Sequence, residues 1–240
     1  MCDVRKSAVR LVLTGLAVVL LTGAFTPGKA QMKKRKQESH ARRETNATRV
    51  ARIQHTIQDT YTHRYEVIGG GGYLRFRSGD YTQKNNEVSW ATALNYYLNP
   101  KLAIVGDARG SFGNAHQQQP LLYPQIVRPL INEYTFMGGA SYRFYAKEKV
   151  AYSVQALGGT AWGLFSGGGK GLTGPELGLW HDGFRPAFSV GVSADYNLYP
   201  NLAFRVTPTY VATDFVGANG STIQNNMGFN VGVVYRFGRQ

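Results

Sequence analysis

The sequence is poor in the residues that build several common kinds of site. Its only cysteine is Cys2, so no disulfide framework can form. Only 17% of its 240 residues are charged. Beyond the basic N-terminal stretch the only histidines are His116 and His181, and no Cys/His or paired-carboxylate spacing suggests a metal site. We therefore expect no metal and no cofactor, and we assign no catalytic residue.

Glycine and aromatic residues, by contrast, are abundant. The chain has 29 glycines, 15 tyrosines and 12 phenylalanines. Tightly packed strands use glycine, and the interfaces of a membrane favour aromatic side chains. This composition favours a β-barrel over a helical fold.

The last segment, 226–237, separates into two faces when every second residue is taken. One face is Met227, Phe229, Val231, Val233, Tyr235 and Phe237, and the other is mostly small or polar. A period of two places each set on one side of a strand. A strand of roughly 10 residues with bulky residues on one face and polar ones on the other is typical of a transmembrane β-barrel.

Seven earlier segments show similar alternation. The eight predicted strands are 65–77, 88–98, 102–112, 133–145, 150–162, 185–198, 202–214 and 226–237. Their connections alternate between short turns and long loops rich in Gly, Asn, Gln and Pro, which is the asymmetry of outer-membrane barrels. The sequence predicts an all-β fold: an eight-stranded antiparallel transmembrane up-and-down β-barrel over 65–240, preceded by a signal peptide and a basic, mostly disordered N-terminal arm.

Residues 1–30 have the features of a secretory signal peptide. Arg5, Lys6 and Arg10 form a positive start, an apolar run follows, and Gly28 and Ala30 fit a cleavage site before Gln31. An uncleaved membrane anchor is the alternative. Cys2 is at the wrong end of the run for a lipoprotein.

Residues 31–64 hold nine basic residues against three acidic ones, a large part of the net charge of +13. We interpret this stretch as a solvated, disordered arm. Val50, Ile53 and Ile57 recur at helical spacing, so a short amphipathic helix over 44–58 is the alternative. For an exported segment, anionic lipid headgroups or an anionic cell-wall polymer are nearer partners than nucleic acid, and we expect no nucleic-acid partner.

The alternation also predicts which charged side chains point into the barrel. Two turns with the pattern Leu-x-Pro-x-Leu-Ala pair Leu98 with Leu102 and Leu198 with Leu202 on the outside, which sets Asp195 opposite Arg205 inside. The first strand is ambiguous, because Gly69–Gly72 permits a bulge that reverses its faces. The predicted lumen charges are Asp107, Arg109, Arg143, Asp195, Arg205 and Arg236. Since a barrel of eight strands is only wide enough for side chains, we interpret them as a plug of salt bridges, with a narrow channel as the alternative.

Two stretches suggest chemistry but lack its full pattern. The run from Ser166 to Gly171 is not a phosphate-binding loop, because Leu164 stands where the first glycine belongs and Gly171 follows the lysine. His181 and Asp182 beside Trp180 are the best candidates for an acid–base pair. Neighbouring residues on an extended chain point apart, which argues against a direct dyad.

The strand run resembles the small bacterial outer-membrane β-barrel domains, the superfamily that includes the transmembrane domain of outer-membrane protein A. The resemblance covers 65–240 and rests on Gly72-Tyr-Leu-Arg-Phe76, the two Leu-x-Pro turns, Tyr142-Arg-Phe144 and Gly232-Val-Val-Tyr-Arg-Phe237. It implies an outer-membrane location with the arm and the C-terminus in the periplasm, contact with outer-membrane lipid and lipopolysaccharide, and recognition of the last strand by the barrel-assembly machinery. Phe237 matches the family's terminal aromatic residue, although three residues follow it.

From these features we expect a non-catalytic protein that acts in envelope structure or surface contact through its outer loops. A small pore for ions or solutes and a lipid A-modifying enzyme are the two alternatives.

Overall fold

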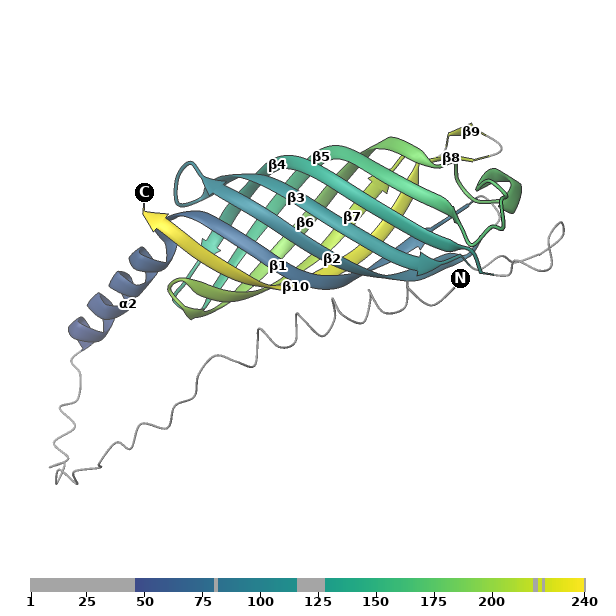
Figure 1. Ribbon diagram of the computed structural model, residues 1–240. Helices are drawn as coiled ribbons and strands as arrows, with labels where there is room; N and C mark the ends of the chain where they lie inside the picture. The colour runs from purple at the N-terminus through teal and green to yellow at the C-terminus, as the bar shows by residue number, and fades with distance from the viewer. Residues whose placement is uncertain (1–45, 80–81, 116–127, 218–219, 222, 240) are drawn as a thin grey trace, which may run out of the picture. The chain divides into compact units, whose positions relative to one another are not determined.

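The computed structural model describes residues 46–240 except 80–81, 116–127, 218–219, 222 and 240 (Figure 1). It contains one closed barrel of eight strands, each antiparallel to its neighbours, with the last strand closing on the first. This confirms the predicted antiparallel barrel of eight strands. The barrel strands are β1 (His63–Arg77), β2 (Lys84–Tyr97), β3 (Leu102–Asn114), β4 (Leu130–Ala146), β5 (Val150–Gly167), β6 (Gly183–Tyr199), β7 (Leu202–Thr213) and β10 (Gln224–Arg239).

Three short elements accompany the barrel. They are the helix α2 (Asn46–Tyr61) before the first strand, the 3-10 helix η1 (Pro175–Leu177) between β5 and β6, and a small hairpin of β8 (Val216–Gly217) and β9 (Gly220–Ser221). We call the end of the barrel with the short connections the turn end, and the opposite end, which carries η1 and the hairpin, the loop end. Both α2 and the end of β10 lie at the turn end (Figure 1).

The first strand keeps one alternation throughout. Glu66 on one side of Gly69–Gly72 and Leu74 and Phe76 on the other all point inward, and the pairing with both neighbouring strands is unbroken. No bulge therefore reverses the faces of β1. A Cβ added at Gly70 would lie 2.1 Å from the carbonyl oxygen of Val231, so the backbones approach too closely there for any other residue.

The two Leu-x-Pro turns give matching registers one hundred residues apart, with Tyr96 opposite Ile104 and Tyr196 opposite Phe204. The second turn differs from the prediction in one detail. A one-residue irregularity after Asn197 makes Tyr199, not Leu198, the partner of Leu202. The extra residue is absorbed beside the turn, so Asp195 still lies opposite Arg205.

The outer surface is an apolar band bounded by aromatic contacts at both ends. At the turn end Tyr65 packs on Tyr96 and Phe237, with ring centroids 5.3 and 5.4 Å away. At the loop end Tyr73 packs on Phe229, with centroids 5.8 Å apart. Tyr65 and Tyr73 are eight residues apart on one strand, roughly 26 Å along the strand at about 3.3 Å per residue. With a strand tilt of about 40°, this is about 20 Å along the barrel axis, which fits within a lipid-facing band about 25 Å tall.

The helix α2 occupies part of the stretch for which a disordered arm was favoured. The alternative, a helix over 44–58, is nearer to the structure. A contact with the barrel helps to hold the C-terminal end of the helix in place: the Tyr61 hydroxyl donates a hydrogen bond of 2.7 Å to the Lys147 carbonyl in the β4–β5 turn. Sequence periodicity carries no signal for a contact over that separation. The predicted signal peptide and the rest of the arm lie outside the described residues.

Neither of the two helices described, α2 and η1, has the length together with the hydropathy that a membrane-spanning helix needs.

Candidate functional site

The interior of the barrel is the candidate site, because the inward face of its strands collects buried charge. All six predicted lumen charges are on this face and are at most 9% exposed. Four of them meet at the turn end, and two form a separate pair near the middle of the barrel. The four are Arg143, Asp195, Arg205 and Arg236, and the two are Asp107 and Arg109.

The centre of the turn-end network is Glu66, which the sequence analysis did not identify. Its Oε1 accepts from Arg143 Nη2 at 2.6 Å and from Arg236 Nε at 2.8 Å, and its Oε2 accepts from Arg205 Nη2 at 2.9 Å. One carboxylate thus binds three guanidinium groups from β4, β7 and β10. Its position between the outward residues Tyr65 and Val67 could have indicated that Glu66 points inward. The glycine run that follows left open which face of β1 is the inner one.

Asp195 is the second acid of the network. Its carboxylate accepts from Arg205 Nε at 2.5 Å and Nη2 at 2.7 Å, and from Arg236 Nη2 at 3.0 Å. Two carboxylates therefore face three guanidinium groups, and the cluster carries one net positive charge. Buried charges are tolerated when they are paired and hydrogen-bonded, as these are.

Neutral polar groups complete the network. The Tyr97 hydroxyl donates to Glu66 Oε2 at 3.0 Å and accepts from Arg143, and Asn197 Oδ1 accepts from Arg236 Nη1 at 2.8 Å. The Arg143 guanidinium lies 4.3 Å from the Tyr97 ring centre and 4.7 Å from that of Tyr61. These ring faces accommodate the excess positive charge.

Tyr61 brings the end of α2 into this network. Its hydroxyl accepts from Asn197 Nδ2 at 2.9 Å, and only 5% of the residue is exposed. Burial raises the pKa of the Tyr61 phenol, so it remains a neutral donor at physiological pH. The turn end of the lumen is thus covered by a side chain that precedes the barrel.

Farther along the lumen, Asp107 and Arg109 pair along a single strand. Arg109 Nε and Nη2 donate to the two carboxylate oxygens of Asp107 at 2.7 and 3.2 Å. Beside them is a cavity of about 20 Å³ lined by Ser111, Thr135 and Asn230 among others, which is room for about one water molecule.

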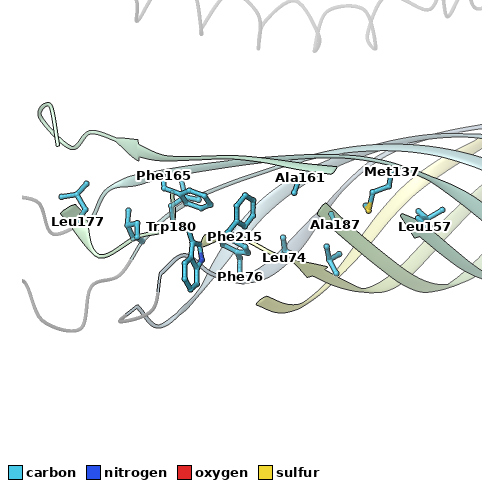
Figure 2. Packing of buried hydrophobic residues seen from close by; sticks show 14 of the residues in the cluster. Leu74, Phe76, Met137, Leu157, Ala161, Phe165, Leu177, Trp180, Ala187 and Phe215 are labelled. Atoms are coloured by element: carbon cyan, nitrogen blue, oxygen red, sulfur yellow. The ribbon is translucent and has the colours of Figure 1, made fainter. Parts of the chain in front are cut away.

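The loop end is filled by an apolar cluster (Figure 2). Phe165 and Phe215 cross edge to face with centroids 5.0 Å apart, and each ring centre lies 6.1 Å from that of Phe76. Trp180 folds in from the β5–β6 loop and its indole Nε1 donates to the Arg77 carbonyl at 2.6 Å. All four side chains are almost completely buried, so they close this end.

Two glutamates near this cluster differ from Glu66. Glu87 on β2 and Glu133 on β4 are at most 1% exposed, and within the described part of the chain none of their carboxylate oxygens has a hydrogen-bond partner. A Cβ at Gly113 would lie 2.7 Å from Glu87 Cγ, so this glycine makes room for the side chain. The sequence analysis identified neither acid.

Within the described residues, His181 and Asp182 do not form a dyad, because no hydrogen bond joins their side chains. The Asp182 carboxylate accepts from the Phe165 backbone N–H at 2.6 Å and from Ser166 Oγ at 2.9 Å, which fixes the β5–β6 loop. The His181 backbone N–H donates to the Val216 carbonyl. His116 lies outside the described residues, and among those described no group of three or more His, Cys, Asp or Glu side chains could hold a metal.

Comparison with known protein families finds no match, and comparison with curated protein sequences finds none either. Several solved structures are similar. The outer membrane protein OprG from Pseudomonas aeruginosa matches with a TM-score of 0.52 at 11% identity, over 75% of this chain and 98% of OprG. Neisserial surface protein A matches with a TM-score of 0.48 at 16% identity, over 72% of this chain and 97% of that one. Ail, the attachment invasion locus protein of Yersinia pestis, gives 0.43 at 16% identity over 73% and 99%.

At these identities the likeness shows the fold. The closed antiparallel barrel of eight strands, its apolar outer band and the match to OprG together give this chain the fold of the small bacterial outer-membrane β-barrel proteins.

Proposed function

We propose that this protein is a bacterial outer-membrane barrel with a closed lumen that acts in envelope structure or surface contact through its loop end. The loop end faces outward and the turn end, with α2 and the C-terminus, faces the periplasm. The apolar band between two aromatic zones supports membrane insertion, and the alternation of short turns with long loops supports this orientation.

The observation that carries the proposal is that side chains fill the lumen at both of its ends. Paired charges cross it around Glu66 at the turn end, and the rings of Phe76, Phe165 and Phe215 cross it at the loop end. An ion would have to displace both layers. A filled lumen favours a structural or contact role over a small pore.

Conductance across a planar lipid bilayer tests this directly. We expect the purified full chain to give no discrete conductance steps. Heat-modifiable migration on gels serves as the control that the protein in the bilayer experiment is folded. A variant with Phe76, Phe165 and Phe215 changed to alanine tests whether the apolar layer alone seals the barrel, and the charge network should keep it closed. Regular steps from the unmodified protein would establish the pore alternative.

The enzyme alternative has less support. Asp182, the better placed half of the candidate pair, is engaged in holding its own loop. We therefore propose a non-catalytic role. Lipid A extracted from cells with and without the gene should have the same mass spectrum, and a difference in acyl chains or phosphates would favour the enzyme.

Two further partners follow from the orientation. The barrel-assembly machinery is proposed to engage β10, whose outward Tyr235 and Phe237 form an exposed aromatic end. The basic arm before the barrel is proposed to contact anionic cell-wall polymer. Both would then lie on the periplasmic side.

A further inference from the structure

An open hollow of about 700 Å³ lies at the loop end, on the rim formed by the ends of β1, β2 and β3. Arg75, Lys84 and Arg128 line it, together with the amide side chains of Gln83, Asn85, Asn86 and Asn114 and the ring of Tyr73. None of the described residues that line it is acidic. The hollow therefore combines positive charge with groups that hydrogen-bond to sugar hydroxyls.

The position of the hollow matches the depth of lipid headgroups. Tyr73 belongs to the aromatic zone that ends the apolar band, where it packs on Phe229. Arg75 points outward from the same strand two residues farther, roughly 7 Å beyond Tyr73 at about 3.3 Å per residue. Aromatic side chains mark the boundary between acyl chains and headgroups, so the guanidinium is placed among the headgroups.

The cations of the hollow are available to a ligand. Arg75, Lys84 and Arg128 are all exposed, and no ion pair joins any of them to a carboxylate among the described residues. Lys84 Nζ donates once, to the Asn225 carbonyl at 2.9 Å, which leaves two of its three donors free. Arg77, opposite Lys84 in the strand ladder, also points outward and adds a fourth positive charge beside the hollow.

Part of the hollow is held in place before any ligand binds. The Tyr73 hydroxyl donates to Asn86 Oδ1 at 2.5 Å, which turns the amide Nδ2 of Asn86 away from the ring. A fixed donor costs less entropy on binding than a free one.

The loop end also has a second hollow, and the charge of its lining residues differs from that of the basic hollow. This second hollow, about 480 Å³, lies at the β5–β6 loop and is lined by Ser166, Thr173, His181 and Asp182 among others. It includes a carboxylate and no lysine or arginine. Two hollows at the same end of the barrel thus differ in the sign of the charge among the described residues that line them.

We propose that the β1–β3 hollow binds the phosphate and sugar of a phosphorylated glycolipid headgroup in the outer leaflet. Arg75 and Lys84 hold the phosphate, Arg75 through the planar fork that fits phosphate oxygens in pairs, and the amides of Asn86 and Asn114 contact the sugar. A lipid is favoured over a free phosphate because the hollow opens beside the apolar band. This inference rests on the proposed outward orientation of the loop end.

The test titrates the full chain, purified in detergent, with diphosphoryl lipid A and counts bound lipid by native mass spectrometry. The variant carries Arg75→Gln and Lys84→Gln. Its control carries Lys101→Gln and Lys170→Gln, which removes the same charge from two exposed lysines outside the hollow. A basic residue near an anionic headgroup contributes about a fivefold change in affinity, so the variant should bind lipid A roughly 30-fold more weakly and the control as tightly as the unmodified protein.

Two further arms identify the source of the phosphate. Dephosphorylated lipid A should bind no better to the unmodified protein than to the variant, and inorganic phosphate should not displace bound lipid A at equal concentration. Equal binding of the phosphorylated and dephosphorylated forms, or equal losses in variant and control, overturns the proposal. Displacement by inorganic phosphate overturns its assignment to a lipid.

Heat-modifiable migration of both variants shows whether each is folded, and bilayer conductance reports separately on the closed lumen. If the protein is folded and non-conducting but binds lipid A equally with and without its phosphates, this inference is wrong and the proposed closed lumen is unaffected. If the protein conducts but still binds the lipid A phosphates, the closed lumen is wrong and this inference is unaffected.

Discussion

Glu66 and Glu87 are both almost completely buried, lie on neighbouring strands and point into the same lumen, yet their surroundings are opposite. Glu66 accepts hydrogen bonds from three arginines, Asn95 and Tyr97. Glu87 lies near an apolar cluster and has no partner within the described residues. The turn end of the barrel is therefore closed by matched charges and the loop end by packed rings.

This difference indicates that the charge network at the turn end and the apolar cluster at the loop end stabilise the barrel in different ways. The charge network joins side chains from β1, β2, β4, β6, β7 and β10, so it forms only when all six strands are in register. The apolar layer draws on loop residues such as Trp180 and Phe215, and it packs by volume. We infer that the turn end specifies the register of the barrel, whereas the loop end mainly excludes water.

The largest effect should come from Glu66→Gln. The change leaves three buried arginines with one carboxylate, and breaking a buried ion pair from one side costs roughly 3–5 kcal/mol. Equilibrium unfolding in urea from lipid vesicles, followed by tryptophan fluorescence, measures the free energy of unfolding. The same chemical change at Glu87 is the control, and similar losses at both positions would remove the distinction between the two layers.

Phe215→Ala tests the apolar layer. The side chain is fully buried between Phe76 and Phe165, so its loss should lower the free energy of unfolding by about 3 kcal/mol. Phe188→Ala is the matched control, because Phe188 faces the lipid and its loss leaves no cavity inside the barrel, so it should cost less. If both changes cost the same, the loop-end cluster does not stabilise the barrel as a core.

Coupling within the charge network is the next effect in size. Arg205→Met should cost less in the presence of Asp195→Asn than alone, since the two side chains share two hydrogen bonds of 2.5 and 2.7 Å. We expect a coupling energy of about 1–2 kcal/mol in a double-mutant cycle. A parallel cycle of Arg205→Met with Asp107→Asn should be additive, because Asp107 bonds to Arg109. Additive losses in the first cycle would show that the turn-end pair is not coupled.

Much of this fold could be predicted from the sequence because a period of two is a local property. The alternation located β3 from Leu102 and β10 from about Asn226, near the observed bounds. It also predicts that Arg143 and Arg236 point inward, since each lies between two outward aromatic residues. Most strands extend beyond their predicted bounds, β5 by five residues, because pairing continues where the pattern of side chains fades, whereas β2 and β7 each end one residue earlier than predicted.

Contacts between side chains that are far apart in the sequence could not be predicted from this alternation. Glu66 follows from alternation only if β1 has no bulge, and the four glycines carry no side chain that could decide this. Phe165, Trp180 and Phe215 lie at strand ends or in loops, where no period applies, and their contacts span far-separated parts of the chain. The docking of Tyr61 on the β4–β5 turn is of the same kind.

The smallest effect, and the one that differs in sign, is expected from Glu87→Gln and Glu133→Gln. A buried carboxylate without partners is costly, whereas a neutral amide of nearly the same volume costs less to bury. Each change should therefore leave the free energy of unfolding within about 1 kcal/mol of the unmodified protein, on the stabilising side. The urea series used for Glu66→Gln gives the comparison under identical conditions. A loss at Glu87 or Glu133 as large as that at Glu66 would mean that the acid has a binding partner inside the lumen, and the apolar layer would then contain a second charged site.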